Sequence, residues 1–155
     1  MKVKRLMCGF LACVVMLGAT IPSARAEEVP REAIIWLEDL KWEWVDPTKV
    51  ERLETDIALQ TTDLINHVFL RYSTGAVTDP TYLNARSTVT FNCSYSPSSV
   101  SMDFGVIDTS GRFYFINVKE GSINQTLGIS QAGTYQVAIR NNSSQTVRVV
   151  GFVDY

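Results

Sequence analysis

The stretch VTFNCSYSPSSVSMDFGV, residues 89–106, decides the fold of this protein. Every second residue is apolar in each half of it, first at Val89, Phe91, Cys93 and Tyr95 and then at Val100, Met102, Phe104 and Val106. Successive side chains of a β-strand point to opposite faces, so a strand that buries one face alternates in this way. The stretch therefore predicts two neighbouring strands, each with one face in a core.

The same pattern continues to the C-terminus. Residues 123–129 and 135–139 also alternate, and residues 112–118 and 146–153 are partly apolar on both faces, as expected near the centre of a sheet. Short turns rich in Gly, Asn, Asp and Ser separate these segments. The pattern predicts a mainly β protein whose core, residues 87–155, is an antiparallel, jelly-roll-like β-sandwich.

The segment 27–86 has a different character, because it is acidic and contains all three tryptophans. Residues 30–45 place Trp36, Leu37, Leu40 and Trp44 at helical spacing, which predicts a helix. Thr48 and Glu51 form a capping box that predicts a second short helix. Residues 64–72 suit a helix or a strand equally well. We therefore expect a partly helical N-terminal extension of the sandwich.

Residues 1–26 are typical of an export signal. Lys2, Lys4 and Arg5 precede an apolar run, and small residues at Ala24 and Ala26 fit a cleavage site. As a helix the run spans about 21 Å, which is short of a ~30 Å membrane core. We expect a removed signal, no stable membrane anchor, and a secreted extracellular product of bacterial character.

The charge of the predicted mature chain excludes two classes of partner. The whole chain has 14 Lys and Arg against 16 Asp and Glu, and four of the basic residues belong to the signal. A net negative domain is a poor partner for nucleic acid or an anionic membrane.

The chain offers few groups for catalysis, metal binding or cofactors. His67 is the only histidine, lies in the run Asn66-His67-Val68-Phe69, and is expected to be a structural or surface residue, not a catalytic one. Cys93, the one cysteine outside the signal, is expected to be a buried, unreactive thiol because it occupies an apolar strand position. One His and one Cys are too few for a zinc site, and Asp103 and Asp108 lack calcium-loop spacing. We predict no enzyme, no catalytic residue, no metal and no cofactor.

Two short motifs carry a family resemblance. Ile107-Asp108-x-Ser110-Gly111, followed by Ala132-Gly133-Thr134-Tyr135-x-Val137, resembles bacterial pre-peptidase C-terminal domains and similar small secreted jelly rolls over residues 87–155. The resemblance implies the fold alone, because no acidic cluster matches the calcium sites of some members. Independently of it, Gly133 permits a tight turn and Tyr135 can bury its ring while its hydroxyl meets backbone at a corner.

Aromatic side chains are the candidates for ligand binding. Trp42, Trp44 and Tyr114 could stack on a sugar ring or anchor a protein partner. Trp42 and Trp44 share one face if their segment is extended and diverge if it is helical. The favoured alternative is that Trp36 and Trp44 seal the helix onto the sandwich, because indoles are usually well buried.

Three function classes remain open from the sequence. The leading hypothesis is a secreted, non-catalytic module that binds a surface polymer, either a glycan or a protein. The alternatives are a structural or assembly protein of the cell envelope and a small secreted hydrolase with a carboxylate pair.

Overall fold

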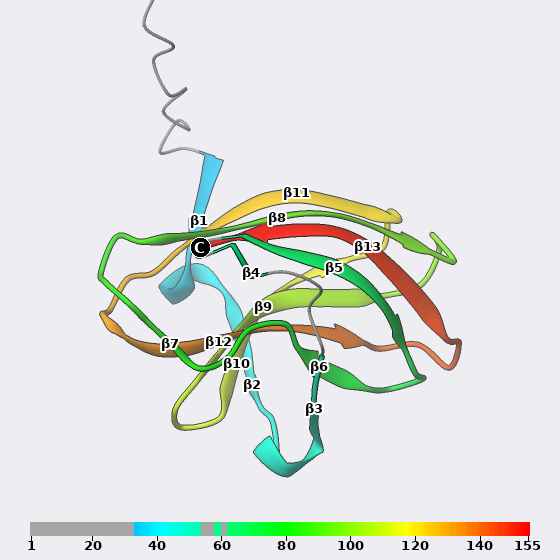
Figure 1. Ribbon diagram of the computed structural model, residues 1–155, viewed down its shortest axis with the longest axis horizontal. Helices are drawn as coiled ribbons and strands as arrows, with labels where there is room; N and C mark the ends of the chain where they lie inside the picture. The colour runs from blue at the N-terminus through cyan, green and yellow to red at the C-terminus, as the bar shows by residue number, and fades with distance from the viewer. Residues whose placement is uncertain (1–32, 54–57, 60–61) are drawn as a thin grey trace, which may run out of the picture.

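The computed structural model describes residues 33–53, 58–59 and 62–155, which form two β-sheets packed against each other (Figure 1). The strands are β1 (Ile34–Trp36), β2 (Lys41–Trp44), β3 (Val50–Arg52), β4 (Ala58–Leu59), β5 (Thr62–Phe69), β6 (Thr74–Ala76), β7 (Thr81–Leu83), β8 (Thr88–Ser96), β9 (Met102–Asp108), β10 (Arg112–Val118), β11 (Ser122–Gly128), β12 (Gly133–Asn141) and β13 (Val147–Asp154). Two 3-10 turns, η2 (Leu37–Asp39) and η3 (Pro47–Lys49), lie beside β2.

Most neighbouring strands are antiparallel. Sheet A has the order β1-β11-β8-β13-β5-β4, and sheet B has the order β2-β10-β9-β12-β6-β3 with β7 also paired to β12. The pairs β1–β11 and β3–β6 are parallel. In Figure 1, β11, β8, β13 and β5 lie in one layer and β9, β10 and β12 in the other.

The alternation seen in the sequence builds the core between the sheets, so the six predicted strands are confirmed as β8 to β13. Phe91 on β8 and Phe104 on β9 are fully buried, and their rings lie 5.8 Å apart across the two sheets. Cys93 and Tyr95 are buried on the same face of β8.

The opposite face of sheet B is also buried. Ile107, Phe113, Phe115 and Ala138 form a second apolar cluster, and Val45 and Val50 pack against it. The chain between β2 and β3 passes from one edge of sheet B to the other and so covers this face. This explains why residues 112–118 are apolar on both faces.

The prediction of a helix over residues 30–45 is wrong for the residues described, 33–45, which form β1, η2 and β2. β1 pairs with β11 of sheet A, and β2 pairs with β10 of sheet B. Leu37, in the turn between them, is buried in the core. Pairing with two open sheet edges outweighs the helical spacing, because strand hydrogen bonds and burial are gained together.

The second predicted helix is also absent, since residues 47–49 form only the turn η3 and the chain continues as β3. Asp46 caps this turn, accepting hydrogen bonds from the backbone N and the hydroxyl of Thr48 at 3.0 and 2.7 Å. The ambiguous run at residues 64–72 lies largely in β5, where pairing with β13 selects the strand.

The predicted export signal, residues 1–26, lies outside the described residues. Among the residues with a described structure, no helix has the length and apolar character needed to cross a membrane.

Candidate functional site

The three residues predicted to bind a ligand meet at one edge of sheet B. β2 is the edge strand, and its register with β10 sets Trp42 opposite Tyr114 and Trp44 opposite Arg112. Opposite residues of an antiparallel pair place their side chains on the same face. We call these four residues, Trp42, Trp44, Arg112 and Tyr114, the aromatic corner.

Both indoles of the corner are open to solvent. Trp42 is 47% exposed and Trp44 is 65% exposed, and their rings lie 5.6 Å apart at an interplanar angle of 90°. The shared face confirms the expectation for an extended segment. The favoured interpretation, in which Trp44 is packed, is wrong because β2 is an edge strand whose indoles lie beyond the core.

Trp36 is partly buried, as that interpretation expected, but it packs from strand β1 and not from a helix. It lies on β1 opposite Gly128 of β11, and a side chain at position 128 would overlap the indole ring. Trp36 therefore has a packing role at the edge of sheet A.

Arg112 links the aromatic rings of the corner. Its guanidinium carbon lies 6.0 Å from the Trp42 ring centroid and 5.7 Å from that of Tyr114, within the range of a cation–π contact. Its Nε donates to Asp108 Oδ2 at 2.8 Å. The aromatic corner thus contains the Arg112 cation, whose charge is balanced by the Asp108 carboxylate.

Asp108 is fixed in a turn. Its Oδ1 accepts hydrogen bonds from the backbone N of Ser110 at 2.9 Å and of Arg112 at 3.0 Å. Gly111 closes the turn with a φ of +87°, a conformation that favours glycine. Burial raises the pKa of Asp108, but hydrogen bonds from Ser110 and Arg112 outweigh it and hold the pKa below its usual value.

A pocket of about 240 Å³, which we call the η2 pocket, adjoins the corner. Its lining residues are Leu37, Glu38, Tyr114, Ser130, Gln131 and Tyr135. The Tyr135 hydroxyl donates to the backbone oxygen of Gln131 at 2.9 Å, which confirms the predicted contact at a corner. Burial raises the pKa of Tyr114 and of Tyr135, so both phenols stay neutral in ordinary conditions.

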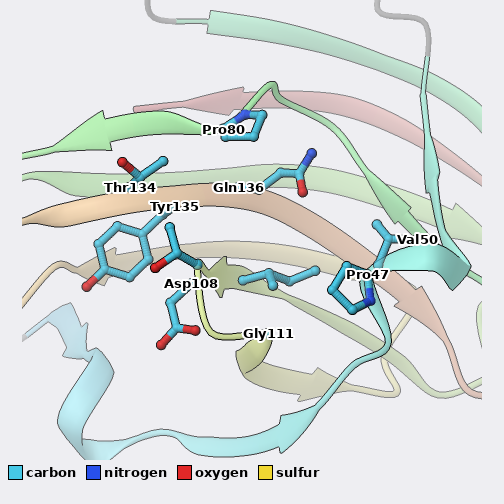
Figure 2. A pocket seen from close by; sticks show the side chains of 10 residues that line it. Pro47, Val50, Pro80, Asp108, Gly111, Thr134, Tyr135 and Gln136 are labelled. Atoms are coloured by element: carbon cyan, nitrogen blue, oxygen red, sulfur yellow. The ribbon is translucent and has the colours of Figure 1, made fainter.

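A second pocket, of about 180 Å³, is bordered by residues of the β9–β10 turn, among them Asp108, Thr109 and Gly111. Figure 2 shows Pro47 and Val50 at one end of it and Tyr135 and Asp108 at the other. Pro80 lines it as well. Its walls are largely apolar, and its one carboxylate, Asp108, is already committed to the turn.

The structure places His67 and Cys93 apart from the corner. His67 is partly buried on β5 with its ring 5.1 Å from that of Phe69. Cys93 is buried, as predicted, and its Sγ lies 3.6 Å from the backbone oxygen of Phe152. Burial raises the pKa of the Cys93 thiol to about 12, which keeps it protonated.

In the described part of the chain, no group of three His, Cys, Asp or Glu side chains lies close enough together to hold a metal ion. Asp103 and Asp108 lie on β9, but Asp103 is fully buried on the opposite face of sheet B from the corner.

Sequence reasoning missed Arg112 and Glu38 as parts of the site. The period-two run Lys41-Trp-Glu-Trp44 was itself a strand signal. Arg112 stands two residues before Tyr114 in a predicted strand, which already set both on one face. No sequence signal could have placed Glu38 and Tyr114 at one pocket, because this depends on the chain crossing between the sheets from β1 to β2.

Comparisons of the chain with protein-family models, with curated proteins and with solved structures found no match. The resemblance to pre-peptidase C-terminal domains therefore stays a prediction, and the chemistry of the corner must carry the functional conclusion.

Proposed function

We propose that this protein is a secreted, non-catalytic module that binds a surface glycan through the aromatic corner. The observation that carries the proposal is the pair of exposed indoles, Trp42 and Trp44, on the edge strand β2, which is hydrogen-bonded to β10. Single exposed aromatic side chains are common at a surface, but adjacent ones that form a contiguous patch mark an interaction site.

The geometry of the pair suits a sugar ring. The apolar C–H face of a pyranose packs on the flat face of an indole, and a second indole at 90° offers a wall beside it. Strand pairing places Trp42 and Trp44, the Arg112 contact holds the Trp42 ring, and the Trp44 ring packs edge-on against Trp42, so less conformational freedom is lost on binding. Preorganised aromatic contacts of this kind favour binding at low entropic cost.

The fold supports the same role. From β10 to β13 consecutive strands alternate between sheets B and A, an arrangement that supports the jelly-roll-like sandwich we propose as the framework. Such a framework holds the corner at a rigid edge while its loops remain free to vary.

Titration of the purified protein with soluble polysaccharides, followed by tryptophan fluorescence, tests the proposal. We expect a ligand that shifts the emission of the wild type, and at least about tenfold weaker binding for Trp42→Ala and Trp44→Ala, since aromatic anchors dominate such sites. Tyr82→Ala is the matched control, because Tyr82 is also an exposed aromatic residue but lies on β7. Equal affinity of all three variants would exclude the corner as the binding site.

An assembly role is the second candidate function. It is favoured by exposed apolar side chains on the outer face of sheet A, namely Leu64, Val68 and Val150, together with exposed Leu70 directly after β5. Such a group is typical of a surface that docks on another protein. Light scattering of the purified protein separates the two candidate functions. An assembly protein would associate at high concentration, whereas a monodisperse monomer would exclude the assembly role and leave glycan binding at the aromatic corner.

A further inference from the structure

We infer that the η2 pocket is a second sugar subsite, so that the aromatic corner and the pocket together bind two adjacent units of an uncharged glycan. This inference rests on the proposed function and names the class of ligand for the same site.

The two parts are continuous through one side chain. Tyr114 lies opposite Trp42 in the strand register and also lines the η2 pocket. The Arg112 guanidinium lies within 6.0 Å of both the Trp42 and Tyr114 ring centroids. A chain that stacks on the indoles therefore reaches the pocket without crossing another element.

The size and lining of the pocket suit a single sugar ring. Its volume of about 240 Å³ is below the ~300–1,000 Å³ of pockets that hold drug-sized ligands. Its walls combine the two tyrosine rings with the polar side chains of Glu38, Ser130 and Gln131. Apolar walls with a few polar groups match a pyranose, which carries hydroxyls around an apolar ring face.

Ser130 adds a specific polar contact. Its hydroxyl oxygen is shielded from solvent and has no hydrogen-bond partner among the described residues. Leaving a buried hydroxyl unpaired is unfavourable, so a hydroxyl of a bound ligand would supply the missing partner after rotation about χ1.

The charge near the site favours an uncharged ligand. The Arg112 cation is balanced by Asp108 at 2.8 Å, and Glu43 is paired with Arg140 at 2.8 Å on the opposite face of sheet B. The Glu38 carboxylate at the pocket therefore stands without a cationic partner among the described ion pairs. It can accept hydrogen bonds from sugar hydroxyls but repels the carboxylates of a uronate polymer.

Calorimetric titration with cello-, xylo- and manno-oligosaccharides of one to six units tests the inference, with oligogalacturonides as the acidic counterpart. We expect the second sugar unit to strengthen binding of one neutral series by about tenfold, the equivalent of one charged hydrogen bond. Glu38→Gln and Ser130→Ala should reduce the gain in affinity that the second sugar unit gives. Glu38→Gln should also reduce the ratio of the affinity for the neutral oligosaccharide to that for oligogalacturonides. Glu51→Gln and Ser144→Ala are the controls, since both residues are exposed and outside the site.

The outcomes separate this inference from the proposed function. Binding that depends on Trp42 and Trp44 but shows no increment for a second unit, or no response to Glu38→Gln and Ser130→Ala, would overturn the second subsite and leave the proposed function standing. Tighter binding of oligogalacturonides than of every neutral series would overturn the ligand class. If no oligosaccharide or polysaccharide binds, both proposals fail together.

Discussion

Arg140 on β12 binds Asp103 on β9 across sheet B, with its Nε and Nη2 donating to Asp103 Oδ2 at 2.9 and 2.7 Å. Asp103 is fully buried, and the side chain of Arg140 is only 17% exposed. The third guanidinium contact, from Nη1 to Glu43 Oε2 at 2.8 Å, reaches the edge strand β2. One largely buried cation, Arg140, thus connects the edge strand that carries both indoles to the middle of the sheet.

Removing Arg140 should strongly destabilise the protein. Arg140→Met leaves the buried Asp103 carboxylate without its counter-charge, which typically costs about 3–5 kcal/mol in the free energy of unfolding. Asp103→Asn should cost less, because Arg140 keeps Glu43 as a second partner. Urea denaturation followed by circular dichroism measures this loss.

The exposed ion pair between Arg52 and Asp79 supplies the control. Its side chains are 72% and 61% exposed, so Arg52→Met should change the free energy of unfolding by less than about 1 kcal/mol. Similar losses at the two pairs would show that burial does not set the strength of the Arg140 contact.

Gly105 on β9 should tolerate no side chain. A Cβ there would overlap the Tyr114 carbonyl oxygen and lie 2.8 Å from the Cα of Phe115, and backbone cannot move aside as a side chain can. Gly105→Ala should therefore separate β9 from β10, with a loss of at least ~3 kcal/mol in the free energy of unfolding or failure to fold.

The matched control for this substitution is Gly133→Ala, because Gly133 begins β12 without a positive φ and so does not need to be glycine for the predicted tight turn. A Cβ at position 133 would meet its nearest atom, on the Tyr135 ring, at 3.4 Å, an ordinary contact. Thermal unfolding of the two variants should differ widely, and equal midpoints would contradict the close approach at Gly105.

The strands from β8 to β13 could be predicted from the sequence because apolar residues recur at every second position along most of them, as around Phe91 and Phe104. The N-terminal strands could not, because Trp36, Leu37 and Leu40 also fit a helix and only the open edges of two sheets decide between the alternatives. The spacing of apolar residues within residues 30–45 does not indicate which sheet edges are free to pair with this segment.

The sequence identified the aromatic residues of the candidate site, but it did not predict how they are arranged in space. The residues Trp42, Trp44 and Tyr114 were singled out, but their common face follows from the register of β2 with β10. The burial of Asp103 with Arg140 joins strands far apart in sequence, and no motif marks such a pair.

The thiol of Cys93 should not react in the folded protein. Burial raises its pKa to about 12, so at pH 8 almost none of it is the reactive thiolate. For the predicted mature chain, which lacks Cys8 and Cys13, a disulfide-exchange reagent such as Ellman's reagent should give no colour with the native protein and one equivalent per chain in strong denaturant. Rapid reaction without denaturant would contradict the buried position of Cys93 against Phe152.

The turn around Asp108 should make stability depend on pH at the acid end. The pKa of Asp108 is lowered in the folded state by hydrogen bonds from Ser110 and Arg112, which outweigh the effect of burial. A group with a lowered folded pKa contributes stability above its unfolded pKa, about 3.9 for aspartate, and loses it as the pH falls through the folded pKa. Urea denaturation at pH 7, 4 and 2 should therefore show the wild type more stable than Asp108→Asn at pH 7, with the difference shrinking toward pH 2.

The control is Asp79→Asn, at an exposed ion pair, whose free energy of unfolding should differ little from that of the wild type at any of these pH values. A difference between wild type and Asp108→Asn that stays constant with pH would mean that the Asp108 turn is held by its geometry and not by its charge.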